Sequence, residues 1–173
     1  MTFIDTFLDK IKPDDVVLDV GAGDGKYAEM MVARGASVFA IDKQKPEKMI
    51  PGVEWHIGQI ENWIEQIDKS IKFNAVFAKN IIQFFDTQFV VEKLLPKLSD
   101  HLTSGGFIAI ETFYRAPEPS FSKPHRSYYS SEDLMKLFSD WKIVFSNSFE
   151  KEAKDMKGIP RKFSITQIIV QKP

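Results

Sequence analysis

The sequence has no cysteine among its 173 residues. This absence excludes disulfides, thiolate metal sites and a cysteine nucleophile. Long hydrophobic runs are also missing, so no segment has the length of a membrane span. The first residues carry acids and lack the apolar core of a signal peptide. We therefore expect a cytoplasmic protein with no membrane partner.

The chain also has no excess of positive or negative charge. The 23 Lys and Arg residues nearly balance the 24 Asp and Glu residues, which leaves a net charge of −1. Such a chain has no overall field that attracts a polyanion, so we do not expect a nucleic-acid partner. Apolar residues make up 43% of the chain and charged residues 27%, as in folded soluble proteins. No linker or repeat divides the chain, and we expect one domain over residues 1–173.

The most informative stretch begins with the apolar, β-branched run of residues 16–20, the pattern of a strand buried in a parallel sheet. This run ends in Gly21, Gly23 and Gly25, and glycine allows the backbone to turn tightly and to approach a ligand closely. A helical pattern follows, and then a second apolar run that ends in Asp42. The arrangement predicts a βαβ unit that binds an adenosine-containing ligand.

The glycine spacing distinguishes between the possible ligands. A dinucleotide site expects Gly-x-Gly-x-x-Gly or Ala, but Lys26 occupies the sixth position, which disfavours a nucleotide-dependent oxidoreductase. The pattern Asp19-x-Gly21-x-Gly23-x-Gly25 instead resembles motif I of the class I S-adenosylmethionine-dependent methyltransferases. The alternative is a glycine turn in some other α/β domain, and Asp19 and Asp42 in matching positions disfavour it.

The resemblance implies S-adenosyl-L-methionine as the cofactor. It places Asp19 and the glycine turn at the methionine end and the carboxylate of Asp42 on the ribose hydroxyls. Gln59 stands where the family often has an acid for the adenine amino group, and its amide oxygen can still accept a hydrogen bond. The residues assigned to the cofactor are Asp19, Gly21, Ala22, Gly23, Asp42, Lys43, Gln59, Ile60, Lys79 and Asn80.

The same resemblance implies an α/β, Rossmann-like fold. It has a seven-stranded, mostly parallel sheet of order 3-2-1-4-5-7-6, with strand seven antiparallel and helices on both faces. Pro96 should kink or divide a helix over residues 87–102. We expect the charged segment 150–162 to be a solvated hairpin connection, and the alternative is part of the substrate rim. Hydrophobic patterns place further helices at 3–11 and 61–69, and strands at 38–42, 52–57, 73–78, 107–113, 141–147 and 163–170.

A long irregular segment, residues 113–130, is expected to choose the substrate, because loops of this length are usually functional or disordered. Methyl transfer needs a general base only if the nucleophile must lose a proton. His125 is the candidate base, with an exposed loop histidine as the alternative. Tyr114 and Arg115 are candidate substrate contacts, and no metal is expected. Glu111, near the end of strand five, should need a partner if it is buried.

These observations predict a small S-adenosylmethionine-dependent methyltransferase that acts on a small molecule, as a monomer or homodimer. The stretch from His125 to Leu134 is similar to the small tellurite-resistance-type methyltransferases. One alternative is an RNA or protein methyltransferase of the same fold. Another is a non-catalytic module that binds S-adenosylmethionine without transferring its methyl group.

Overall fold

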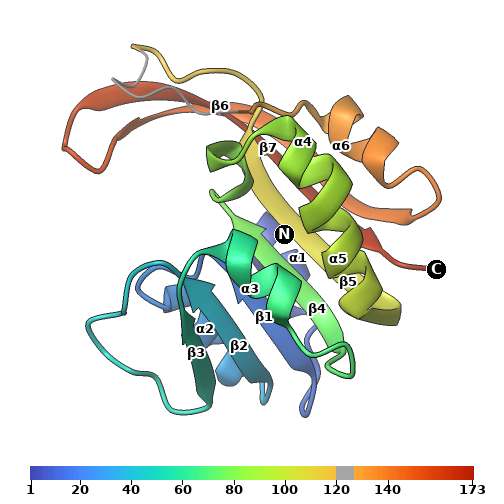
Figure 1. Ribbon diagram of the computed structural model, residues 1–173. Helices are drawn as coiled ribbons and strands as arrows, with labels where there is room; N and C mark the ends of the chain where they lie inside the picture. Colours follow the sequence, from blue (N-terminus) through green and yellow to red (C-terminus); the bar gives the residue numbers. More distant parts are fainter. Residues whose placement is uncertain (120–126) are drawn as a thin grey trace.

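The computed structural model describes residues 1–119 and 127–173, which form a seven-stranded sheet of order β3-β2-β1-β4-β5-β7-β6 (Figure 1). Neighbouring strands from β3 to β5 are parallel, whereas β7 runs antiparallel to both β5 and β6. This confirms the predicted order and direction. The strands are β1 (Val16–Val20), β2 (Ser37–Asp42), β3 (Val53–Ile57), β4 (Phe73–Lys79), β5 (Leu102–Phe113), β6 (Lys142–Lys154) and β7 (Pro160–Gln171).

Helices cover both faces of the sheet. In Figure 1, α3, α5 and α6 lie in front of the sheet, and α1 and α2 lie behind it. No helix within the described ranges combines the length and the apolar character that a membrane span requires. The helices are α1 (Phe3–Leu8), α2 (Lys26–Val32), α3 (Ile60–Gln66), the 3-10 turn η1 (Ile82–Phe84), α4 (Thr87–Phe89), the π-helix η2 (Val90–Leu94), α5 (Leu95–His101) and α6 (Ser131–Leu137).

Each face of the sheet has its own hydrophobic core. In front, Ile64 of α3, Leu98 of α5 and Leu134 of α6 pack on the sheet, and all three are buried. Behind, Phe7 of α1 and Met31 of α2 are fully buried against it. The central strands β1 and β4 are therefore covered on both sides, as expected for the apolar runs in a parallel sheet.

The segment predicted as a divided helix is divided. It passes from α4 through the π-helical turn η2 into α5, and Pro96 lies in the first turn of α5. Proline has no N–H to donate into the preceding turn, so a regular α-helix cannot run through it. A helix tolerates proline in its first turn, which explains why α5 begins one residue earlier.

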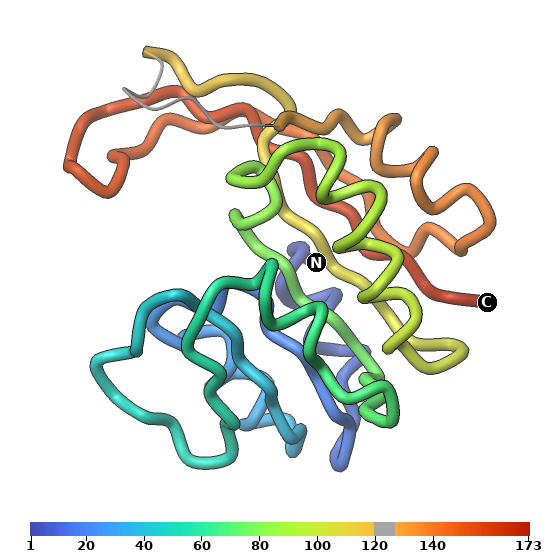
Figure 2. Tube along the Cα trace, in the orientation of Figure 1, coloured from blue at the N-terminus to red at the C-terminus, as the bar shows by residue number. Residues whose placement is uncertain are grey.

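The expectation for residues 150–162 was wrong in its extent. β6 continues to Lys154 and β7 begins at Pro160, so only 155–159 connect the strands. The two strands pair without interruption from Phe149↔Ile165 to Lys154↔Pro160. Figure 2 shows this end of the hairpin projecting from the body of the molecule. We call residues 149–165 the arm.

Candidate functional site

The predicted cofactor residues gather at the carboxyl ends of four neighbouring strands. Asp19 lies near the end of β1, Asp42 ends β2 and Lys79 ends β4, while Gln59 follows β3. The strand order 3-2-1-4 makes these ends adjacent. In open α/β sheets, ligands bind at this edge, where the strand order reverses.

The first two glycines of the turn have different surroundings. Gly21 has φ +73°, and a Cβ there would lie 2.8 Å from Cγ1 of Ile81, so the turn packs directly against the residues that follow β4. Gly23 has φ +59°, and a Cβ there would meet no atom within 4 Å. The open space at Gly23 is a place where a ligand can approach the backbone closely.

The side chain of Asp42 holds the turn in place. Its Oδ2 accepts a hydrogen bond of 2.9 Å from the backbone N–H of Gly23, and its Oδ1 accepts one of 2.9 Å from that of Gln44. A carboxylate oxygen can accept a second hydrogen bond, so Asp42 keeps capacity for a hydroxyl-bearing ligand.

The carboxyl group of Asp19 is buried, with 2% of the residue exposed. Among the described residues, its Oδ2 has no hydrogen-bond partner. Burial raises the pKa of Asp19 to about 7, and the charges of Asp42 and Asp24 add to this effect. A buried carboxylate without a partner is costly, and a positively charged ligand group beside it would remove that cost.

The residues expected at the adenine lie where β3 passes into α3. Gln59 is the N-cap residue of α3, and its exposed side chain makes no capping hydrogen bond. The side chain of Ile60 is buried in the front core. Lys43 is exposed beside Asp42.

Lys79, which is partly buried, forms an ion pair with the buried Glu111, its register partner on β5. Gln167 of β7 donates a hydrogen bond of 2.5 Å from Nε2 to the other oxygen of Glu111. The Nζ atom of Lys79 also lies 5.6 Å from the ring centroid of Tyr27. Glu111 therefore has the partner that its burial required. Asn80 follows with φ +56°, and its N–H donates to the carbonyl of Glu111 at 2.8 Å.

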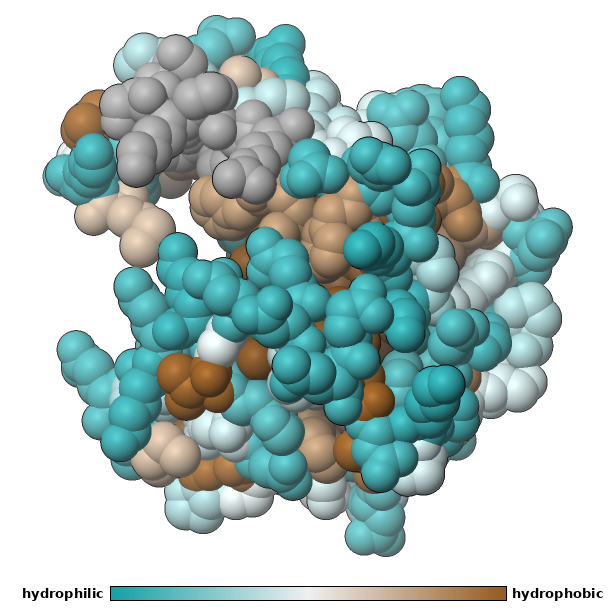
Figure 3. Space-filling view, viewed as in Figure 1, coloured by the Kyte–Doolittle hydropathy of each residue, from teal (hydrophilic) through white to brown (hydrophobic). Residues whose placement is uncertain are grey.

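A cavity of about 680 Å³ lies between the carboxyl end of β4 and the arm. In the space-filling view, the arm overhangs a notch in the left outline of the molecule (Figure 3). The lining residues are Asn80, Gln83, Phe84, Phe113, Lys151, Ala153, Lys154, Asp155, Met156, Lys157, Arg161, Phe163 and Ile165. Asn80 belongs both to this lining and to the predicted cofactor set, so the two regions are continuous.

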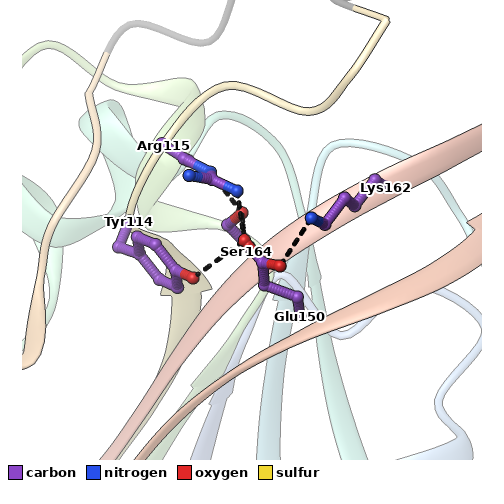
Figure 4. A network of polar contacts seen from close by, with 5 residues as sticks. All are labelled: Tyr114, Arg115, Glu150, Lys162 and Ser164. Carbon is purple, nitrogen blue, oxygen red and sulfur yellow. Dashed lines mark hydrogen bonds and ion pairs between the residues drawn. The ribbon is translucent and has the colours of Figure 1, made fainter.

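Tyr114 and Arg115 belong to a polar network at the base of the arm (Figure 4). Arg115 pairs with Glu150 and donates from Nε to Oγ of Ser164 at 2.7 Å, while the Tyr114 hydroxyl lies 3.5 Å from Glu150. Lys162 also pairs with Glu150, at 2.6 Å. The hydrogen bond from Lys162, together with the positive charges nearby, lowers the pKa of Glu150. The structure thus places Tyr114 and Arg115 in this network and outside the cavity lining.

A second ion pair holds the tip of the arm. Arg161, which is buried, donates from Nε to Oδ2 of Asp155 at 2.6 Å and also donates to the carbonyl of Pro119. The hydrogen bond from Arg161 is the main reason why the pKa of Asp155 is lowered. These contacts connect the tip to the segment after β5. His125, the predicted base, lies outside the described residues.

No individual cavity residue of the arm was predicted from the sequence, and part of the substrate rim was only the alternative for residues 150–162. The arm is rich in charged residues, which is typical of solvated connections. These charges obscured the alternation of side chains that indicates strands. The lining includes alternate residues of both strands, Lys151 and Ala153 of β6 and Arg161, Phe163 and Ile165 of β7, and this period of two was the available signal. Within the described ranges, no group of three or more His, Asp or Glu side chains could hold a metal ion.

Comparison with known proteins yields one curated relative and many similar structures. No protein-family model matches the chain. A trans-aconitate 2-methyltransferase of Azoarcus sp. (strain BH72) is 28% identical over 122 residues, which are 65% of this chain and 46% of the relative. The chain thus spans about half the length of that relative.

Among solved structures, TehB from Haemophilus influenzae superposes with a TM-score of 0.78 at 16% identity, over 98% of this chain and 61% of that chain. A 1,6-didemethyltoxoflavin-N1-methyltransferase of Burkholderia thailandensis superposes with a TM-score of 0.72 at 16% identity, over 99% of this chain and 78% of that chain. That enzyme was crystallised with 1,6-didemethyltoxoflavin and S-adenosylhomocysteine. The sheet order and these neighbours show that the chain has the class I methyltransferase fold, which confirms the resemblance drawn from motif I.

Proposed function

We propose that this chain is an S-adenosylmethionine-dependent methyltransferase with a small-molecule acceptor. The observation that carries the proposal is the buried carboxyl of Asp19, whose Oδ2 has no hydrogen-bond partner among the described residues and which lies beside an open glycine turn. Burial and the charges of Asp42 and Asp24 raise the pKa of Asp19, and a cationic ligand group would stabilise its ionised form. When bound, S-adenosylmethionine supplies a methyl group on a positively charged sulfur.

The chain's own residues fit such a ligand. The absence of a side chain at Gly23 leaves room for it, and Asp42 has acceptor capacity for ribose hydroxyls while it holds the turn. Asp19 would neutralise positive charge near the turn. The curated relative is a methyltransferase, and the toxoflavin enzyme binds S-adenosylhomocysteine, which supports this ligand over a dinucleotide.

The cavity beneath the arm is the proposed acceptor site. Gly21 packs on Ile81, and the neighbouring Asn80 lines the cavity, so a methyl group held over the turn would face this space. A volume of about 680 Å³ suits a small molecule and not a folded protein or a nucleic-acid duplex. The main task of the enzyme is to hold the nucleophile and the methyl group in line, which lowers the barrier without a dedicated base.

Calorimetric titration tests this proposal directly. S-adenosylmethionine and S-adenosylhomocysteine should each bind at micromolar concentrations, and NADH, added as the control, should not. Micromolar affinity corresponds to about −8 kcal/mol, well within the range of such measurements. Binding of NADH alone would favour an oxidoreductase, and binding of none of the three would leave only the fold.

A further inference from the structure

We infer that the acceptor is an anionic molecule with a flat, apolar body, such as an aromatic or unsaturated carboxylate. This inference rests on the proposed function, because it assigns the cavity beneath the arm to the acceptor. It follows from three features of the described lining residues: aromatic walls, uncompensated lysines and an oriented amide.

The aromatic walls come from three parts of the chain. Phe84 of η1 lies on the side of the body, Phe113 ends β5, and Phe163 belongs to the arm. Phe84 is 50% exposed and Met156, at the tip of the arm, is fully exposed. Large apolar side chains that converge on one cavity are suited to a flat apolar ligand, because they bury its surface and stack on its face.

The positive charge comes from the arm. Lys151, Lys154 and Lys157 line the cavity, and none of them pairs with a carboxylate in the described residues. Asp155 is the one acid among the described lining residues, and its carboxylate is bound by Arg161. A cleft with charge of one sign focuses its field on the ligand, so these lysines favour an anion.

An amide lies at the inner end of the cavity. Gln83 is buried, and its Oε1 accepts a hydrogen bond of 3.1 Å from the hydroxyl of Thr112. This contact orients the amide, and Nε2 donates no hydrogen bond to any described residue. Such a donor on the cavity wall can donate to an oxygen acceptor on the ligand.

The placement of these groups also orients the acceptor. The lysines lie on the arm, whereas Asn80 and Gln83 lie near the glycine turn, so the anionic end points toward the arm and the reacting atom toward the turn. In the transfer, a lone pair of that atom forms a bond to the methyl carbon while the carbon–sulfur bond breaks. The electron pair stays on sulfur, which becomes neutral, and any proton on the nucleophile passes to water.

The test compares two probes of the same shape, 2-naphthoate and its neutral amide, 2-naphthamide, by calorimetry with the unmodified chain. We expect the acid to bind about tenfold more tightly than the amide at low ionic strength. In about 0.5 M salt this preference should shrink, because exposed charges are screened. Acetate should not compete with naphthoate, since it lacks the apolar body.

Two triple variants show where the preference originates. The change of Lys151, Lys154 and Lys157 to Gln should reduce naphthoate binding to the level of naphthamide. The same change at the exposed lysines Lys12, Lys69 and Lys93 alters the net charge equally and should leave the preference intact. Phe84→Ala should weaken both probes.

Equal binding of the two probes, or an equal effect of both triple variants, would overturn the inference. S-adenosylhomocysteine is titrated into each protein as a separate measurement. If it binds while the probes show no charge preference, the inference fails and the proposed function stands. If the charge preference is present without S-adenosylhomocysteine binding, the cavity assignment as an anion site stands and the proposed function fails.

Discussion

Gly23 and Asp42, 19 positions apart, are joined by a hydrogen bond of 2.9 Å from the backbone N–H of the glycine to Oδ2 of the aspartate. The other oxygen of Asp42 accepts from the N–H of Gln44. One carboxylate therefore fixes both the glycine turn and the connection that leaves β2. The shape of the proposed cofactor site and its acceptor groups depend on the same side chain.

Replacement of Asp42 by Ala should damage the site in two ways. The turn loses its hydrogen bond and the ligand loses an acceptor, so S-adenosylhomocysteine should bind at least about tenfold more weakly. The free energy of unfolding should fall by about 1–3 kcal/mol, as for other hydrogen bonds to a charged group. Calorimetry and urea denaturation measure the two effects. Asp140→Asn, at an exposed position, is the control.

Two glycine substitutions should separate folding from binding. Gly21→Ala combines a left-handed backbone with a Cβ 2.8 Å from Ile81, and it should destabilise the fold by about 2–4 kcal/mol. Gly23→Ala has a left-handed backbone but open space, so it should cost only about 1–2 kcal/mol. Its new methyl group nevertheless occupies the proposed ligand space, and S-adenosylhomocysteine binding should be lost. A Gly23→Ala protein with unchanged affinity would show that the ligand does not approach this residue.

The central part of the fold was predictable because its signals are local. The apolar run at 16–20, the glycine turn and Asp42 follow each other within one βαβ unit, and the carboxyl edge of a parallel sheet brings their ends together. Pro96 likewise acts through its own missing N–H. Each of these predictions needed only residues that are close in sequence.

The site around the arm was not predictable in the same way, because its contacts join distant strands. Arg115 is a candidate substrate contact by sequence, and the structure adds its ion pair with Glu150 of β6. Lys79 is a candidate cofactor contact, and the structure adds its ion pair with Glu111, its register partner on β5. Both ligand contacts stay predictions. The ion pairs depend on strand register, which a sequence pattern does not specify.

The pair of Lys79 and Glu111 predicts a double-mutant cycle. Lys79→Met alone leaves a buried carboxylate with Gln167 as its remaining partner, and the free energy of unfolding should fall by about 3–5 kcal/mol. The double variant Lys79→Met, Glu111→Gln removes both charges and should recover most of that loss. Urea denaturation of the wild type, the two single variants and the double variant gives the coupling energy. Additive losses would mean that the two charges do not stabilise each other.

The raised pKa of Asp19 gives a pH dependence with a definite sign. The pKa is 3.8 for a free aspartate and about 7 in the folded chain, so the folded state holds this proton more tightly than the unfolded state does. This group therefore lowers the free energy of unfolding as pH rises between these values, by roughly 1 kcal/mol per pH unit. Above the folded pKa this dependence ends. Asp19→Asn should remove it, so the variant should gain stability over the wild type at pH 8 and little at pH 4.

The affinity for S-adenosylmethionine should depend on pH in the opposite sense to the free energy of unfolding, because of the same carboxyl group of Asp19. A cationic ligand favours the ionised carboxylate, so S-adenosylmethionine should bind more weakly as pH falls below about 7, and its binding at pH 6 should release a proton. Calorimetry in two buffers of different ionisation enthalpy measures that proton directly. In Asp19→Asn, the proton release and the pH dependence of affinity should both disappear, whereas the variant should be the more stable protein at pH 8. A gain in stability together with a loss of binding would show that this buried charge is retained for the ligand, because it weakens the fold.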